Sequence, residues 1–228
     1  MLDFHTHILP SVDDGSKSVE ESMEILSMLS EQGVKTVVAS SHYYAEHESP
    51  EQFLERRNLA YNKLSPMLKP HHPKILLGAE VRYYEGISRM QALKSLCIEG
   101  TDLLLLEMPF ARWSSSMLKE ICAIACSGEV RVVLAHIERY LAMQEKGIID
   151  RLHEDGILVQ TNASFFADFL TRRNAIRLLK KSSFDFIGSD CHGAERRPPR
   201  MSQARDVIIK KLGEEFLSDF VGYSNNLL

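Results

Sequence analysis

Two histidines and three carboxylates lie within the first fifteen residues, MLDFHTHILPSVDDG. His5 and His7 are two positions apart, so in an extended strand their side chains point to the same side and can bind one ion. Asp14 follows in the next loop, within reach of the same ion. We interpret Asp3 as a residue that orients the histidines from deeper in the strand, and Asp13 as an ordinary loop residue.

The same residue types recur farther along the chain, each time at the end of an apolar run. They are His42 in VVASSHYY, Glu80 in ILLGAE, Glu107 in LLLLEMPF, His136 in RVVLAHIER, and Asp190 and His192 in FIGSDCH. Only the run that ends at Thr161-Asn162 lacks a strong ligand. Nine carboxylates and imidazoles on one rim would repel one another or lose hydration unless cations held them. The sequence therefore predicts a metal site formed by His5, His7, Asp14 and these six residues.

The types of ligand restrict both the metal and its chemistry. Oxygen and imidazole ligands without a thiolate favour manganese, iron or zinc over copper(I) or an iron–sulfur cluster. Nine ligands exceed the needs of one ion, so we expect two or three ions joined by bridging carboxylates. Such a cluster provides a hydroxide at neutral pH and binds both oxygens of an in-line displacement. This chemistry favours phosphoester hydrolysis, with the metal-bound hydroxide attacking phosphorus.

Seven apolar runs alternate with helical patterns along the chain. They are Leu2–His5, Val34–Ser40, Lys74–Glu80, Asp102–Glu107, Arg131–His136, Ile157–Thr161 and Phe184–Ser189. Most are continuously apolar, as expected for parallel strands that helices cover on both faces. We expect an α/β fold in which residues 1–228 form one domain, a distorted TIM-like (β/α)7 barrel. The carboxyl ends of the strands in such a barrel carry its chemistry.

Local signals mark several helix ends. Ser18–Glu21 predicts a capping box, and Gly33 predicts the end of the helix that follows it. Ser49-Pro50 predicts another helix start. A further helix is expected to begin near Arg139 and to end before Gly156.

Composition excludes several classes of protein. A chain of 228 residues that is 44% hydrophobic can fold without disulfides, and its net charge of -4 argues against a nucleic-acid partner. Four cysteines, at Cys97, Cys122, Cys126 and Cys191, match no zinc or redox pattern and suit a reducing compartment. The chain shows no N-terminal signal and no apolar run long enough to span a bilayer, so we expect a cytoplasmic protein without stable membrane insertion.

The pattern of nine residues resembles the PHP (polymerase and histidinol phosphatase) superfamily. Within it, HILPSVDDGS, GAEVRYYE, LLLLEMPF, AHIERY and SDCHGAERRPPRM are most similar to the bacterial manganese-dependent protein-tyrosine phosphatases of capsular and exopolysaccharide operons. The resemblance implies a seven-stranded barrel with three metal ions, Mn²⁺ first among them. It also implies a substrate, the phosphotyrosine-rich tail of an autophosphorylating bacterial tyrosine kinase that drives polysaccharide export.

Two arginines also match that group, Arg139 in HIERY and Arg197 in ERRPP, with Arg196 as the alternative to the second. A guanidinium fork fits the oxygens of a phosphate, so we expect both to bind the phosphoryl group.

Several aromatic and basic residues complete the expectations. Tyr43-Tyr44 follows His42 where relatives are expected to have a second histidine, which would alter the pocket wall or the affinity of one metal. Tyr83, Tyr84 and Trp113 are candidates to stack on a tyrosine ring. The arginines in RRNLAYNK and TRRNAIR lie on helical patterns, as solvated faces or as contacts in a homo-oligomer or with an acidic partner.

Other functions remain open on the sequence alone. The chain could be another phosphoesterase of the superfamily, such as a histidinol-phosphatase-like enzyme, or a metal-stabilised module that binds a kinase without catalysis. Metal-dependent DNases also begin H-x-H, but they lack the counterparts of Asp14 and His42 and the closing D-x-H. Amidohydrolases typically have a lysine after the fourth strand, where this chain has Glu107.

Residues 191–197 also fit C-x5-R, the phosphate loop of cysteine-dependent tyrosine phosphatases. In that mechanism a low-pKa thiolate attacks phosphorus. The neighbouring Asp190 would oppose a thiolate at Cys191, and the D-x-H motif is better explained by metal ligation.

The two mechanisms make opposite predictions for two substitutions. We expect Cys191→Ser to keep phosphatase activity and His136→Ala to abolish it, because only the histidine belongs to the predicted metal site. Rates of phosphate release from a phosphotyrosine peptide measure both effects. Loss of activity in Cys191→Ser with retention in His136→Ala would contradict the metal mechanism.

Overall fold

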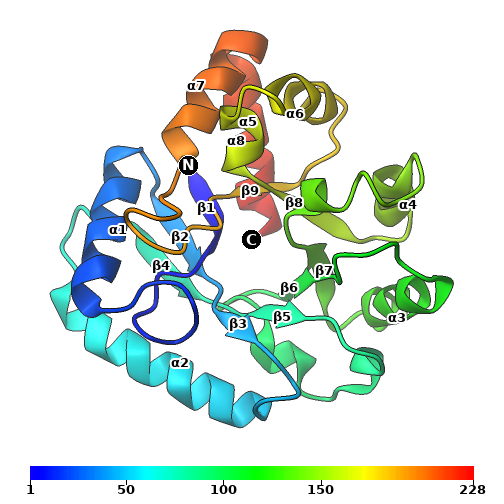
Figure 1. The fold of residues 1–228 in the computed structure, drawn as a ribbon, viewed down its shortest axis with the longest axis horizontal. Helices are drawn as coiled ribbons and strands as arrows, with labels where there is room; N and C mark the ends of the chain where they lie inside the picture. The colour runs from blue at the N-terminus through cyan, green and yellow to red at the C-terminus, as the bar shows by residue number, and fades with distance from the viewer.

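The computed structural model describes residues 1–228, in which seven parallel strands surround a central axis with helices outside them (Figure 1). Two of the seven strands are interrupted. The strand segments are β1 (Leu2–Thr6), β2 (Thr36–Ala39) continued by β3 (His42–Tyr43), β4 (Lys74–Leu77) continued by β5 (Glu80–Arg82), β6 (Leu103–Glu107), β7 (Arg131–Leu134), β8 (Leu158–Asn162) and β9 (Phe186–Gly188). All seven expected strands are therefore present, in the expected order.

The strands pair only in parallel and curl into a distorted barrel. One sheet has the order β1-β2-β4 and the other has the order β3-β5-β6-β7-β8-β9. The first and last strands also meet, because the His7 amide donates to the Cys191 carbonyl at 2.9 Å and the Asp190 amide donates to the His5 carbonyl at 2.7 Å. The predicted fold class, an α/β barrel of parallel strands, is confirmed.

The interruptions in two strands were not predicted. Between β4 and β5 the chain passes through Gly78, and the segment before β6 fills the space beside it. Here the Glu99 amide donates to the Leu77 carbonyl at 2.7 Å, and the Ile98 amide donates to the Leu103 carbonyl at 2.9 Å. Because this segment takes hydrogen bonds that a continuous ladder would use, β4 and β6 do not pair directly.

Eight α-helices connect or flank the strands. They are α1 (Val19–Glu31), α2 (Pro50–Leu64), α3 (Ser115–Cys126), α4 (Ile148–Glu154), α5 (Ala163–Ala167), α6 (Arg172–Leu179), α7 (Met201–Leu212) and α8 (Glu214–Leu227). Short 3-10 turns occur at Ser65–Met67, Ile87–Arg89, Leu93–Leu96 and Ile137–Arg139. None of these helices has the length and apolar character that crossing a bilayer would require.

The helix signals hold with two corrections. Gly33, at φ 82°, follows the cap of α1, and Ser49 forms a capping box with Gln52 at the start of α2. Ser18 caps α1, but the Glu21 side chain accepts from the amide of Lys17 in place of closing a box. The helix expected near Arg139 is only a 3-10 turn there, and α4 begins at Ile148 after Gly147, which has φ 82°.

Apolar side chains fill both sides of the strands, and this explains the run Leu103–Leu106. Leu104 and Leu106 belong to the large core under the helices. Leu103 and Leu105 belong to a smaller cluster with Phe4 and Phe186, drawn from strands on several sides of the barrel and therefore lying inside it. Glu107 is the next residue in that inward alternation, which directs it to the mouth of the barrel.

Asp185 joins three elements at the far side of the barrel. Its carboxylate accepts from the Tyr223 hydroxyl of α8 at 2.7 Å and the Val159 amide of β8 at 2.8 Å. The same carboxylate pairs with His153 Nε2 of α4 at 2.9 Å. This hydrogen bond raises the pKa of His153 above its ordinary value. The pair therefore stabilises the folded state most when His153 is protonated.

The sign of this pKa shift predicts how stability changes with pH. The contribution of His153 is fully present below the ordinary histidine pKa and is lost as the pH rises through the raised pKa. Hence His153→Gln should lower the free energy of unfolding more at about pH 6 than at about pH 9. Urea unfolding at both values measures the difference, with the exposed His71→Gln as the control. An equal loss at both values would contradict the assignment.

Candidate metal centre

The nine predicted residues lie together at the carboxyl ends of the strands. Their potential ligand atoms form three groups, each within 4.8 Å: His7, Asp14, His42 and His192; His5, His7 and Asp190; and His42, Glu80 and Glu107. His136 joins them, because its Nε2 lies 3.0 Å from Glu80 Oε1 and 3.6 Å from Glu107 Oε1. The groups share members, so the nine side chains form one continuous cluster.

Glu80 lies at the middle of the cluster and is 1% exposed. Its Oε2 is 3.1 Å from His5 Nε2, 3.3 Å from His7 Nε2 and 3.1 Å from His42 Nδ1. Yet neither Glu80 Oε2 nor His42 Nδ1 has a hydrogen-bond partner. Buried polar atoms that converge without hydrogen-bonding geometry fit a shared cation, and oxygen with imidazole suits Mn²⁺, Fe or Zn²⁺.

The charges around Glu80 favour the ionised form of its carboxylate. Burial opposes ionisation of Glu80, but the imidazoles around it outweigh burial and hold its pKa well below the ordinary value. Burial likewise opposes protonation of His5 and His7, whereas the nearby carboxylates raise the pKa of both above the usual histidine value. In the absence of a cation, protons on these two rings would supply the positive charge that the carboxylates require.

Strand β8 supplies the support for this cluster and none of the nine residues. Gln160 Oε1 lies 3.2 Å from His5 Nδ1 and accepts from the His136 amide at 2.7 Å. Gln160 Nε2 donates to Asn162 Oδ1 at 2.9 Å, and Asn162 Nδ2 donates to Asp190 Oδ2 at 3.0 Å. This chain of hydrogen bonds leaves His5 Nε2 directed at the cluster and explains why the run ending at Thr161-Asn162 carries no ligand.

Asp13 is not the ordinary loop residue that the sequence suggested. Its Oδ2 lies 2.7 Å from His7 Nδ1 and accepts from the His42 amide at 2.9 Å, while its Oδ1 accepts from the Gly15 amide at 3.0 Å. Asp13 therefore fixes which nitrogen of His7 faces the cluster and holds the start of β3 beside it. The expectation was wrong because the loop folds back over β1.

Asp3 supports the site in a different way from the one expected. Its Oδ1 accepts from the Ser189 amide at 2.6 Å and the His5 amide at 3.4 Å, so it holds two backbones and touches no imidazole. Burial raises the pKa of Asp3 to about 6. The register between β1 and β2 shifts after Asp3, and a bulge of this kind re-aims side chains.

Two glycines make room for the histidines. A Cβ on Gly15 would lie 2.4 Å from His7 Cβ, and a Cβ on Gly188 would lie 2.5 Å from His5 Cβ. Both contacts are far shorter than atoms allow. The loop at Gly15 and the end of β9 at Gly188 can therefore approach His7 and His5 this closely only because these two residues have no side chain.

Arg139 and Arg197 both contact Asp190, and they do so on the side away from the imidazoles. Arg197 Nη2 donates to Asp190 Oδ2 at 2.7 Å, and Arg139 Nη2 donates to the same atom. Asp190 Oδ1 instead faces the cluster, 3.7 Å from His5 Nε2. Arg196 is exposed and makes no such contact, which separates the two members of the Arg196-Arg197 pair.

A cavity of about 360 Å³ opens beside the cluster. Its lining comprises His42, Tyr44, Arg82, Glu107, Met108, Pro109, Phe110, His136, Arg139 and Tyr140. The Tyr44 ring stacks on His42 with centroids 5.3 Å apart, and Phe110 is 74% exposed at the rim. The cavity therefore has aromatic and arginine side chains in its wall, next to carboxylates and imidazoles of the cluster.

The aromatic residues that were expected to stack on a tyrosine ring lie outside this cavity. Tyr83, Tyr84 and Trp113 do not line this cavity. The Tyr83 hydroxyl donates to Glu120 at 2.8 Å, and the buried Trp113 donates from Nε1 to the Pro109 carbonyl at 3.2 Å. In the sequence, only Tyr43-Tyr44, the pair that stands where a second histidine was expected, pointed to the wall of this cavity. Tyr44 lines the cavity, whereas Tyr43 is buried.

The thiol of Cys191 is unsuited to nucleophilic attack. Its side chain is fully buried, and burial together with Asp3 and Asp190 raises its pKa to about 12. A thiol with this pKa stays protonated at neutral pH, so the C-x5-R match does not form a reactive phosphate loop.

Comparison with known proteins places this site in context. The family described as capsular polysaccharide synthesis, CpsB/CapC, matches residues 1–227. The tyrosine-protein phosphatase CpsB of Streptococcus pneumoniae is 31% identical, over 93% of this chain and 91% of the relative. The tyrosine-protein phosphatase YwqE of Bacillus subtilis is 26% identical, over 94% of this chain and 86% of the relative.

Solved structures show the same fold. One from a study of YwqE from Bacillus subtilis and CpsB from Streptococcus pneumoniae, described as unique metal-dependent tyrosine phosphatases, has a TM-score of 0.83 and 24% identity, over 100% of this chain and 94% of the other. Dihydropyrimidinase from Brevibacillus agri has a TM-score of 0.56 and 10% identity, over 98% of this chain and 68% of the other.

The contact between Asp13 and His7 makes a prediction about metal affinity. Asp13→Asn removes the charge that fixes the ring of His7, so the affinity for Mn²⁺ should fall by about 10-fold to 100-fold. Isothermal titration of the metal-stripped protein measures this change, and Asp219→Asn, an exposed residue of α8, is the matched control. Unchanged affinity in Asp13→Asn would show that Asp13 does not orient a ligand.

Proposed function

The chain belongs to the CpsB/CapC family of capsular polysaccharide synthesis proteins, and from this we propose that it hydrolyses phosphotyrosine on a protein of the capsule system. Membership of this family confirms the resemblance that we inferred from the sequence motifs. Like CpsB and YwqE, the protein is a tyrosine-protein phosphatase. The buried cluster of imidazoles and carboxylates supports the proposal that this activity depends on metal ions.

The observation that carries the proposal is the surroundings of Glu80. Three imidazole nitrogens lie within 3.3 Å of one buried, unpartnered carboxylate oxygen. We assign His5, His7, Asp14, His42, Glu80, Glu107, His136, Asp190 and His192 as the residues that hold two or three ions. Mn²⁺ is the ion we propose, and iron and zinc fit the same donor atoms. The ions, when bound, supply a hydroxide nucleophile and neutralise charge on the phosphoryl oxygens.

The arginines bind the phosphoryl group of the substrate in this proposal. Asp190 Oδ2 holds one nitrogen of Arg139 and one of Arg197, which fixes both guanidinium groups at the edge of the cluster. Each guanidinium keeps further N–H donors that can point at phosphate oxygens, and five donors in a rigid fork suit that geometry. Charge on the equatorial oxygens during in-line attack would be stabilised in this way.

The adjoining cavity suits the tyrosine ring of the substrate. Tyr44 and Phe110 offer aromatic surface, and the cavity begins at Glu107 and His136 and so meets the cluster directly. A tyrosine ring positioned here would place its phosphate at Arg139. The leaving phenolate has a pKa of only about 10, so the demand for a strong general acid is modest.

The protein substrate that we propose is the phosphotyrosine-containing tail of an autophosphorylating bacterial tyrosine kinase. Support comes from the association of the family with capsular polysaccharide synthesis and from the tyrosine-phosphatase activity named for its relatives. A tail segment is extended and accessible, so its tyrosines could enter a cavity of about 360 Å³ that a folded surface could not.

One assay tests activity, substrate class and the role of the arginines together. With Mn²⁺, the purified protein should release phosphate from a phosphotyrosine peptide, lose that activity with a chelator, and act poorly on histidinol phosphate. Arg197→Gln should lower kcat/KM by about 10-fold to 100-fold, since it removes a charge-assisted contact with the phosphate. Arg196→Gln, its exposed neighbour, should change kcat/KM by less than about twofold.

Three results would each contradict a part of the proposal. Faster turnover of histidinol phosphate would assign the chain to the other phosphatase activity of the superfamily. Background rates on both substrates with Mn²⁺ present would favour a non-catalytic, metal-stabilised module. Equal losses in Arg196→Gln and Arg197→Gln would remove the specific role of Arg197.

A further inference from the structure

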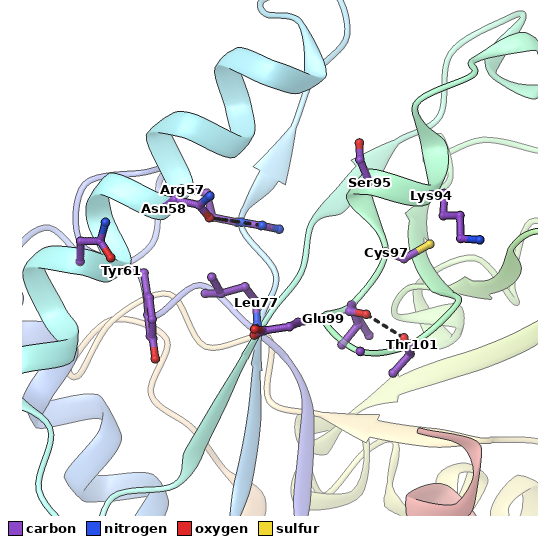
Figure 2. A pocket seen from close by; sticks show the side chains of 12 residues that line it. Arg57, Asn58, Tyr61, Leu77, Lys94, Ser95, Cys97, Glu99 and Thr101 are labelled. Carbon is purple, nitrogen blue, oxygen red and sulfur yellow. Dashed lines mark hydrogen bonds between the residues drawn. The ribbon is translucent and has the colours of Figure 1, made fainter.

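A second cavity lies away from the metal centre, between α2 and the segment 93–101 that leads into β6 (Figure 2). Its volume is about 510 Å³. Polar side chains from both walls face it, among them Arg57, Asn58, Tyr61, Lys94 and Glu99. None of these residues has a role in the activity described above.

Arg57 is the unusual member of this lining, because its charged side chain is only 8% exposed. Nη1 donates to the Gly78 carbonyl at 3.2 Å, and Nε and Nη2 both donate to Asn58 Oδ1 at 3.4 Å. A guanidinium has five N–H donors, so two of them, one on each terminal nitrogen, have no partner in the protein. Figure 2 shows the Arg57 side chain extending from α2 into the space between the two walls.

Arg57 has no salt-bridge partner, although Glu99 in the same lining favours its charge from farther away. No carboxylate lies within 4.0 Å of its guanidinium. The ion pairs that other arginines form are at the surface or in the metal centre. Glu99 is the acidic residue of the lining, and one of its oxygens accepts from the Leu77 amide at 3.3 Å. Burial accordingly lowers the pKa of Arg57. A buried cation without a paired anion is costly, and an anion in the cavity would relieve that cost.

The lining also includes one further hydrogen-bond donor and one further positive charge. Asn58 uses its Oδ1 to accept from Arg57, which leaves its amide nitrogen free to donate. Lys94 places a second positive charge at the exposed edge of the cavity. With one carboxylate against two cations, the lining has a net positive charge.

We propose that this cavity binds a phosphate-class anion, which accepts hydrogen bonds from the two free N–H groups of Arg57 and from the amide of Asn58, while Lys94 adds positive charge at the rim. Parallel N–H groups on the two terminal nitrogens of a guanidinium match two oxygens of a phosphate. The cavity is larger than a phosphate and falls in the size range of small-molecule sites, so it has room for an organic group beside Tyr61 and Leu77. The anion is therefore either free phosphate or the phosphate of a small organic ester.

Equilibrium dialysis of the metal-loaded protein tests the proposal, with radiolabelled inorganic phosphate as the probe. The wild type should bind phosphate at two sites, the metal centre and this cavity. Arg57→Gln should bind it at one, and Lys94→Ala should weaken one of the two sites by about tenfold. Lys63→Ala, which removes the same charge from the exposed surface of α2, should leave both sites unchanged.

Controls separate this site from folding and from the proposed activity. Lys94→Ala should keep the wild-type kcat/KM on a phosphotyrosine peptide. A phosphate site that is lost in Arg57→Gln identifies this cavity whether or not the metal centre also binds phosphate. If Arg57→Gln does not fold, Lys94→Ala alone decides. Phosphate binding in Arg57→Gln and Lys94→Ala that equals that of the wild type in number of sites and in affinity would overturn the proposal. Competition by phenylphosphonate at this site, stronger than by unlabelled phosphate, would identify an organic ester as the class of ligand.

Discussion

Glu80 is a carboxylate that is 1% exposed and surrounded by imidazoles, and this arrangement is stable only if positive charge lies among them. Protons could provide that charge at low pH. In our proposal metal ions provide it at neutral pH without requiring each ring to be protonated, and they would also satisfy the unpartnered atoms of Glu80 and His42. The need for a cation at this point explains why so many other groups in the barrel mouth are arranged around it.

The barrel meets this need through backbone features as much as through ligands. The bulge in β1 re-aims the chain before His5, and Gly188 and Gly15 let neighbouring backbone approach the two histidines. His136 and Asp190 both adopt left-handed backbone angles, φ 32° and 53°, that are unfavourable for residues with side chains. Asp190 then divides its two oxygens between the cluster and the arginines. Strain of this kind persists because the surrounding strands hold both residues in place.

Sequence reasoning predicts that the nine residues lie together, and it does so for a physical reason. Parallel strands end on one rim, so a polar residue after each apolar run is brought to a common place whatever the lengths of the helices between them. The same reasoning does not predict the interruption between β4 and β5, because residues 74–82 have the pattern of one continuous strand. It also places the start of α4 too early, since nothing local distinguishes the 3-10 turn at Ile137–Arg139 from the first turn of a helix.

The supporting residues could not be predicted, because their roles depend on contacts between distant segments. Nothing in the sequence distinguishes Asp13 from an ordinary loop residue or marks Gln160, although each fixes one of the first two histidines. The cavity wall at Tyr44 and Phe110 and the isolated charge of Arg57 likewise depend on the packing of loops. A pattern of residue types identifies the ligands of an ion more readily than the groups that orient them.

The central claim is that the nine side chains around Glu80 hold metal ions. Anomalous diffraction from crystals grown with Mn²⁺ tests it most directly, by locating the ions at the manganese absorption edge. The account predicts two or three anomalous peaks, all within the space bounded by the nine side chains and at least one of them bonded to Glu80. The absence of a peak at Glu80 with Mn²⁺ present in excess would contradict it.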